Sequence, residues 1–124
     1  MTLLEHATRL QEMANGPAIL DAVETYYADD VTVVEANGET FRGKQTQKER
    51  IVEWQKGVEA IHSSEVTAIA AHETAPGTGV VFAESAMDAT FVGAGRMPFE
   101  EVAVQRWEDG KVVHERFYYD APGG

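Results

Sequence analysis

Apolar residues recur at three- and four-residue spacing near the start of the chain, a pattern typical of an amphipathic helix. The spacing predicts a helix over residues 3–14. Thr2 precedes this helix as its N-cap, and Glu5 stands three residues later, which completes a capping box. Asn15-Gly16 ends the helix.

Two further apolar stripes predict a second and a third helix. Pro17 is suited to the first turn of the second helix. Its stripe consists of Ile19, Leu20, Val23, Tyr26 and Tyr27. The third helix begins at Lys44, and its stripe consists of Ile51, Trp54, Val58 and Ile61. Between the two helices, residues 28–30 (Ala-Asp-Asp) break the helical period, residues 31–35 read as a strand, and residues 40–42 read as a short returning strand.

The second half of the chain is rich in β-formers. Three runs over about residues 65–73, 79–92 and 97–108 are separated by Gly-containing turns, and a last strand continues to Asp120. Helices followed by long antiparallel strands are typical of an α+β domain, in which the helices cover one face of a bent sheet. The far face would then be exposed, and Val and aromatic residues there would suit a homodimer interface.

Asp109-Gly110 lies between two of these runs and predicts a hairpin over residues 99–120 with a two-residue type I′ turn. The turn sets the expected cross-strand pairs: Glu108–Lys111, Trp107–Val112, Gln105–His114, Ala103–Arg116 and Glu101–Tyr118. Because strand side chains alternate, one face is expected to gather Glu101, Gln105, His114, Arg116 and Tyr118. The opposite face would hold Val102, Val104, Glu115, Phe117 and Tyr119. A β-bulge along the hairpin would exchange the two faces beyond it.

Composition and charge narrow the classes of function. The 124 residues suffice for one domain, residues 1–124, with a single core. A net charge of −11 argues against nucleic acid and anionic membrane surfaces as partners. The absence of Cys excludes disulfides, thiolate catalysis and Cys-based metal sites. No run approaches the ~20 apolar residues of a membrane span, and the start lacks the pattern of a signal peptide, so a cytoplasmic location is expected.

Sequence motifs for cofactors or metals are not evident. The chain contains no Gly-x-Gly-x-x-Gly, P-loop or Gly-x-Ser-x-Gly pattern. Its four His residues lack partners at metal-ligand spacing. We therefore expect neither a cofactor nor a metal ion.

Two segments, YYADDVTVVEANGETFRGK and VAVQRWEDGKVVHERFYYD, resemble the nuclear-transport-factor-2-like superfamily, and within it the SnoaL-like small-domain proteins. The resemblance implies a cystatin-like α+β fold, a cone-shaped barrel made of a strongly curved, mostly antiparallel sheet with three helices in the N-terminal half. It also implies a homodimer. The superfamily includes isomerases, dehydratases, cyclases, epoxide hydrolases and non-enzymatic binding domains, so the fold does not settle the function.

Glu35 is the first catalytic candidate. In ketosteroid isomerases a catalytic carboxylate ends the strand that follows Ala-Asp-Asp, and Glu35 occupies the similar position here. A carboxylate in a half-apolar pocket can move a proton to or from carbon next to a carbonyl; the alternative is a solvated Glu beside a turn. The oxyanion hole of those isomerases needs a Tyr on the first helix and an Asp on a late strand. Both are missing here, so steroid isomerase activity is not expected.

His114 is the second catalytic candidate, because histidine changes charge near neutral pH; a structural hydrogen bond is the alternative role. Limonene epoxide hydrolase offers another template, whose last strand resembles Arg-Asp-Tyr-Phe-Asp. Phe117 stands where the catalytic Asp would be expected, which argues against that mechanism. Asp120 could serve as an acid–base group beside His114, as in the dehydratases and cyclases of the superfamily.

Candidate ligand-binding residues come from the hairpin and from the two Trp residues. They are Trp54, Glu101, Gln105, Trp107, Arg116 and Tyr118. The polar members would form a patch in a cavity wall, or alternatively a salt-bridge ladder on the outer face or in a dimer interface. The sequence therefore predicts a domain that binds a small apolar or carbonyl-containing molecule, with cofactor-independent isomerase, dehydratase or cyclase activity. The alternative is a non-catalytic dimeric ligand carrier or interaction module.

Overall fold

A computed structural model describes residues 1–119, which form three helices and one six-stranded sheet. The elements are α1 (Leu3–Ala14), α2 (Ile19–Tyr26), β1 (Tyr27–Val34), β2 (Thr40–Arg42), α3 (Lys44–Gly57), β3 (Val58–Ala75), β4 (Thr78–Phe91), β5 (Gly95–Glu108) and β6 (Lys111–Tyr118). The sheet order is β2-β1-β6-β5-β4-β3, in which β1 and β6 are parallel and the other neighbours are antiparallel. The predicted α+β class with a mostly antiparallel sheet is confirmed.

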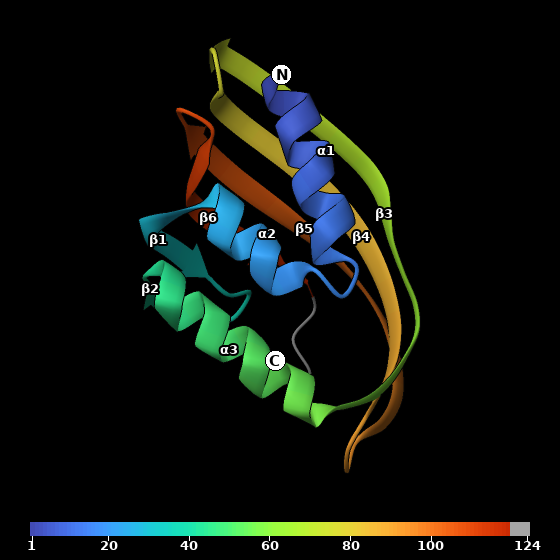
Figure 1. The fold of residues 1–124 in the computed structure, drawn as a ribbon. Coiled ribbons are helices and arrows are strands. Elements are labelled where there is room, and N and C mark those ends of the chain that lie inside the picture. The colour runs from blue at the N-terminus through green and yellow to red at the C-terminus, as the bar shows by residue number, and fades with distance from the viewer. Residues whose placement is uncertain (120–124) are drawn as a thin grey trace.

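The sheet curls around the helices. β3, β4 and β5 bend strongly, and α1, α2 and α3 all lie on the concave side (Figure 1). The pairing of β3 with β4 contains four register shifts, and such bulges bend and twist a strand. The sheet remains open, since β2 and β3 are its two edges. In the described part of the chain, no helix combines the length and the apolar character needed to cross a membrane.

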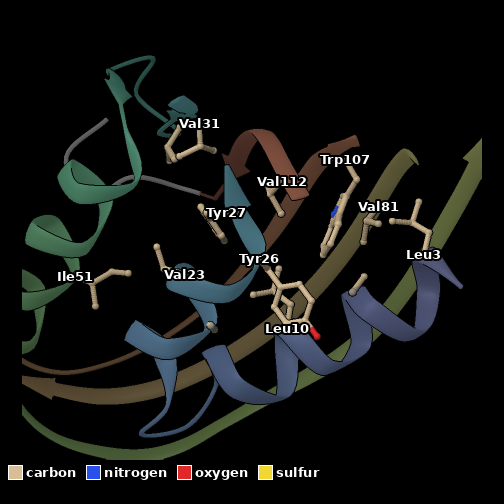
Figure 2. Close-up of a cluster of buried hydrophobic side chains, with 13 residues drawn as sticks. Leu3, Leu10, Val23, Tyr26, Tyr27, Val31, Ile51, Val81, Trp107 and Val112 are labelled. Atoms are coloured by element: carbon tan, nitrogen blue, oxygen red, sulfur yellow. The ribbon is translucent and has the colours of Figure 1, made fainter. Parts of the chain in front are cut away.

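The main core fills the space between α1, α2 and the sheet (Figure 2). Its largest member is Trp107, which is 1% exposed and has its ring centroid 5.8 Å from that of Tyr26. The other buried members are Leu3, Ala7, Leu10, Ala22, Val23, Tyr27, Val31, Val33, Ile51, Val81 and Val112. Tyr26 and Tyr27 both belong to this core, but Tyr27 is the first residue of β1 and not part of the second helix, to whose apolar stripe it was assigned.

The first helix follows the sequence prediction closely. Its bounds are Leu3–Ala14, and the reciprocal hydrogen bonds between Thr2 and Glu5 form the predicted capping box. The second helix begins later than predicted, since Pro17 lies in the turn before its N-cap, Ala18. These local signals act within a few residues, which explains why they can be read from the sequence.

Two predicted boundaries between helix and strand are wrong. Val58 and Ile61 belong to β3 rather than to the third helix, which ends at Gly57. Gly57 is unfavourable in a helix, and the pairing of Val58 with Phe91 in β4 takes over directly after it. The predicted break at residues 28–30 is likewise part of β1, because Tyr27 already pairs with Val112 of β6.

The β5–β6 hairpin has the predicted turn but a different register. Asp109 and Gly110 have φ values of 49° and 79°, as a type I′ turn requires. The pairs Glu108–Lys111 and Trp107–Val112 are confirmed, but a register shift follows. Beyond it the pairs are Arg106–His114, Gln105–Glu115, Val104–Arg116, Ala103–Phe117 and Val102–Tyr118.

The predicted pairs Gln105–His114, Ala103–Arg116 and Glu101–Tyr118 are therefore wrong. Val113 is the extra residue of a β-bulge, and a one-residue shift moves every later side chain to the other face. We call the helix-covered face of the sheet the inner face and the other the outer face. Asp120, the predicted end of the last strand and an acid–base candidate, lies outside the described residues.

Candidate functional site

A chain of hydrogen-bonded polar side chains is buried on the inner face. The indole Nε1 of Trp107 donates to Oε1 of Gln105 over 3.1 Å, and Nε2 of Gln105 donates to Oε2 of Glu115 over 2.6 Å. The hydroxyl of Tyr27 donates to the other carboxyl oxygen of Glu115. Gln105 and Glu115 are 1% and 2% exposed, so these bonds replace water as their partners.

Burial dominates the electrostatics of this chain. It raises the pKa of Glu115, while the hydrogen bonds from Gln105 and Tyr27 act in the opposite direction. It also raises the pKa of Tyr27 well above its ordinary value, and the charge of Glu115 adds to that effect. A carboxylate in this position remains tolerable only because both of its oxygens are satisfied.

Glu35 follows β1 and is held by two donors from distant parts of the chain. Nη2 of Arg50 on α3 lies 2.5 Å from its Oε1, and the hydroxyl of Tyr119 donates to its Oε2 over 3.0 Å. Arg50 also donates to Gln47, and its guanidinium carbon lies 3.6 Å from the centre of the Phe41 ring. The side chains of Glu35 and Arg50 are 19% and 26% exposed. A ligand can therefore reach a carboxylate whose orientation is already set.

Glu101 lies two residues before Ala103 and four before Gln105 on β5. Because strand side chains alternate, it shares the inner face with these two buried residues. No hydrogen bond to its carboxyl group is found among residues 1–119. Burial raises the pKa of Glu101 to about 7, and the charges of Glu115 and Glu35 act in the same direction. Burial and the charge of Glu35 also raise the pKa of Tyr119 to about 12. Within residues 1–119, Glu101 is thus a largely buried carboxyl group without a hydrogen-bond partner and with a raised pKa.

An aromatic row leads from the end of α3 to β5. The ring centroids of Trp54 and Phe91 are 6.2 Å apart, and those of Phe91 and Phe99 are 6.4 Å apart. Phe99 lies two residues before Glu101, so both side chains share the inner face of β5. Trp54, at the end of the row away from Phe99, is 39% exposed, so the row ends in an accessible apolar surface.

A hollow of about 900 Å³ is lined by residues of β3, β4 and β5 together with Ala36, Tyr118 and Tyr119. Its lining residues are Ala36, Ser63, Glu65, Ala86, Met87, Asp88, Pro98, Phe99, Glu100, Tyr118 and Tyr119. Many of them, such as Glu100 and Tyr118, occupy outward-facing positions. Tyr119 also lines the hollow, and its hydroxyl contacts Glu35. The side chain of Tyr119 therefore links the hollow to the Glu35 carboxylate.

The structure divides the residues singled out in the sequence between the two faces. Glu101 and Gln105 lie on the inner face, and Trp107 is part of the core. Glu35 interacts electrostatically with Glu101, because its charge contributes to the raised pKa of Glu101. The bulge puts the other hairpin candidates, His114, Arg116 and Tyr118, on the outer face. His114 and Glu35 consequently do not face one shared space, and the polar patch expected on one hairpin face is split.

Four residues of this constellation escaped the sequence reasoning: Tyr27, Arg50, Glu115 and Tyr119. Glu115 and Tyr119 were placed on the opposite face, because the turn sets the register only as far as the first bulge. Val113 carries no bulge signal, since it is neither Gly nor Asn. Arg50 sits among charged and amide residues of α3, which gives no hint of its partner. Within residues 1–119, no group of His, Cys, Asp and Glu side chains could hold a metal ion.

Solved structures similar to this chain support the same architecture. A candidate SnoaL-like polyketide cyclase from Mesorhizobium loti is 26% identical, with 96% of this chain and 100% of that chain covered and a TM-score of 0.72. A candidate polyketide cyclase from Pseudomonas putida KT2440 is 17% identical, with 98% and 94% covered and a TM-score of 0.78. An LEH-like epoxide hydrolase from M. tuberculosis is 19% identical, with 95% and 82% covered and a TM-score of 0.72.

The family is established at the level of sequence. No curated protein matches the chain significantly. A model of the SnoaL-like domain, however, matches residues 1–119, which is nearly the whole chain. The fold, with its curled sheet around three helices, agrees with that match. This chain belongs to the SnoaL-like domain family.

Proposed function

We propose that the chain binds a small, largely apolar molecule with a carbonyl group and moves a proton on it without a cofactor. One observation carries the proposal: two carboxyl groups that differ in environment interact at the inner face. Glu35 accepts from Arg50 and Tyr119, whereas Glu101 has no partner among residues 1–119 and a pKa raised to about 7. Pairs of carboxyl groups in such unlike environments are typical of acid–base catalysis.

The environments assign a role to each carboxyl group. Glu35 is the base, since its two donors fix the orientation of its carboxylate. Glu101 is the acid, since near neutral pH a large fraction of it carries a proton. Glu35 takes a proton from the carbon next to the carbonyl while Glu101 gives its proton to the carbonyl oxygen, which yields a neutral enol. When the ligand has a double bond one carbon further along, the enol is a dienol: protonated Glu35 then gives its proton to the far carbon of the dienol while Glu101 takes back the proton of the enol oxygen, which completes an isomerisation.

The aromatic row supports an apolar ligand. Trp54, Phe91 and Phe99 lie beside the inner face that carries Glu101, and aromatic walls with few polar groups are typical of small-molecule sites. The solved relatives named polyketide cyclase and epoxide hydrolase agree with an enzymatic role on a small molecule.

Proton exchange on simple ketones tests the proposal without knowledge of the natural substrate. Cyclohexanone and acetophenone are incubated with the protein in D2O, and loss of the protons next to the carbonyl is followed by NMR. We expect exchange faster than in buffer, and a loss of roughly 100-fold in Glu35→Gln and Glu101→Gln. Glu108→Gln, an exposed carboxylate on the outer face of the same strand and outside the lining of the hollow, is the matched control and should match the parent protein. Equal rates in all four proteins would refute the proposal.

A second candidate is a homodimer that acts as a ligand carrier or interaction module. Its support lies on the outer face, where Phe82 and Tyr118 are 46% and 51% exposed. The guanidinium carbon of Arg116 lies 5.2 Å from the centre of the Tyr118 ring there, so this face combines a cation with exposed aromatic surface. Light scattering at micromolar concentration tests it: a dimer that Tyr118→Ser dissociates supports this surface, and a monomer rules the dimer out.

A further inference from the structure

The two oxygens of the Glu35 carboxylate have hydrogen-bond partners of different kinds. Nη2 of Arg50 donates to Oε1 over 2.5 Å, while the hydroxyl of Tyr119 donates to Oε2 over 3.0 Å. A guanidinium carries only N–H donors and stays charged, so it can never accept a hydrogen bond. A phenol hydroxyl can both donate and accept. Oε1 therefore has a fixed donor, and Oε2 has a reversible partner.

Two further contacts hold Arg50 in place. Its Nη1 donates over 2.8 Å to the side-chain oxygen of Gln47, which is buried on the same helix, α3. Its guanidinium carbon lies 3.6 Å from the centre of the Phe41 ring, within the range of a cation–π contact. The bond from a guanidinium to a carboxylate is among the strong hydrogen bonds of proteins. Arg50 is therefore anchored on three sides and stays directed at Oε1.

The fixed donor decides which oxygen of Glu35 takes up a proton. A protonated carboxyl group has a carbonyl oxygen, which accepts well, and a hydroxyl oxygen, which is itself a donor. With Arg50 directed at Oε1, the favourable arrangement keeps the carbonyl oxygen there and places the proton on Oε2. Tyr119 can follow this change, because its hydroxyl can turn and accept from the new O–H group. Burial and the charge of Glu35 raise the pKa of Tyr119 to about 12, so the hydroxyl keeps its own hydrogen at neutral pH.

Oε2 is also the oxygen on the side of the hollow. Tyr119 lines the hollow of about 900 Å³, and its hydroxyl contacts Oε2. Arg50, which contacts Oε1, is not among the residues that line it. A ligand that enters from the hollow therefore meets Oε2 before Oε1. The side chain of Glu35 is 19% exposed, so this oxygen is within reach of a ligand.

We propose that Oε2 of Glu35 takes the proton of the ligand, and that Tyr119 is a positioning residue that serves both states of the base. Tyr119 donates to the ionised carboxylate and accepts from the protonated one. In the step itself the C–H bond of the ligand breaks, its electron pair moves into the enol, and an O–H bond forms at Oε2. The inference deepens the proposed function and rests on it, because it names the oxygen at which the base reacts.

NMR can test the reversible hydrogen bond without any ligand. In protein labelled with ¹³C at the tyrosine Cζ carbons, the Tyr119 signal is the one that Tyr119→Phe removes. Glu35→Gln imitates the protonated base, because its amide oxygen can accept from Arg50 while its amide nitrogen donates to Tyr119. We expect the Tyr119 signal to move upfield in Glu35→Gln, since its hydroxyl no longer donates to a carboxylate. The signal of Tyr26, which lies in the core, is the internal reference and should not move.

Ketone exchange in D2O tests the same contact during turnover. Tyr119→Phe keeps the ring that lines the hollow but removes the hydroxyl, so KM should stay within about two-fold while kcat falls roughly 10-fold. Arg50→Lys keeps the positive charge but not the anchored guanidinium, and it should also lower kcat more than it changes KM. Tyr26→Phe is the matched control. It removes a hydroxyl that has no hydrogen bond among residues 1–119, and it should change neither constant.

The outcomes separate this inference from the proposed function. A Tyr119 signal that does not move in Glu35→Gln overturns the inference, as does a Tyr119→Phe variant in which KM rises and kcat does not fall. Exchange that is lost in Glu35→Gln but unchanged in Tyr119→Phe would leave the proposed function standing while the inference fails. The expected signal shift in a protein without ketone exchange would leave Tyr119 as the reversible partner of Glu35 while the proposed function fails.

Discussion

The two faces of β6 have opposite physical characters although they belong to one eight-residue strand. On the inner face, Glu115 is 2% exposed and both of its carboxyl oxygens accept hydrogen bonds. On the outer face, Tyr118 is 51% exposed, and the guanidinium carbon of Arg116 lies 5.2 Å from the centre of its ring. The contrast shows that position relative to the helices, and not residue type, decides which polar groups become coupled.

Burial makes the inner groups depend on one another. A buried carboxylate is costly unless donors satisfy it, so the loss of one partner affects the whole chain of Tyr27, Glu115, Gln105 and Trp107. Exposed ion pairs contribute little, because water and salt screen them. Substitutions on the inner face should therefore have large effects, and matched substitutions on the outer face should have small ones.

Glu115→Leu should destabilise the protein by about 3–4 kcal/mol, because the buried donors of Tyr27 and Gln105 lose their acceptor. His114→Leu, one residue earlier and on the outer face, should change the free energy of unfolding by less than about 0.5 kcal/mol. Urea denaturation of both variants measures the difference. Similar values for the two would show that the faces are not as unlike as the structure indicates.

The raised pKa of Glu101 should make stability fall as pH rises. Its folded pKa of about 7 exceeds the ordinary value of 4.5, so its contribution is fully present below pH 4.5 and is lost as pH passes through 7. The free energy of unfolding should decrease by roughly 2 kcal/mol more between pH 5 and 8 in the parent protein than in Glu101→Gln. Parallel pH profiles for the two proteins would contradict the raised pKa.

The smallest effect is expected from a pair of neighbouring Tyr residues. Tyr119→Phe removes the hydrogen bond to Glu35 and should cost about 1 kcal/mol. Tyr118→Phe removes a hydroxyl from a half-exposed side chain on the outer face and should cost less than about 0.5 kcal/mol. Thermal unfolding of the two variants at one protein concentration measures both. The reverse order would argue that Tyr119 is not held by Glu35.

Much of the architecture was predictable from local patterns. The capping box of Thr2 and Glu5, the three helices, the short β1–β2 hairpin and the Asp109-Gly110 turn all follow from interactions within a few residues. The predictions failed where tertiary pairing competes with local preference. Val58 and Ile61 continue the apolar stripe of a helix, yet pairing with β4 makes them part of a strand.

The candidate site was predictable only in part. Glu35 and Glu101 were singled out as candidates, but not their environments. Glu35 obtains its arginine from 15 residues away, and Tyr27 reaches Glu115 across 88 residues. The pattern of apolar and polar residues cannot predict such contacts, because they form only when β1 pairs with β6 in the sheet and α3 packs against β1.

By itself, the sequence determined the order of the elements, the turn of the last hairpin and the presence of carboxylates and aromatic residues near its strands. Only the tertiary structure decided which of them face the helices. The physical reason is the period of two in a β-strand: the single extra residue Val113 turns Glu115 inward and His114, Arg116 and Tyr118 outward. An irregularity of one residue thus separates a buried carboxylate from an exposed surface.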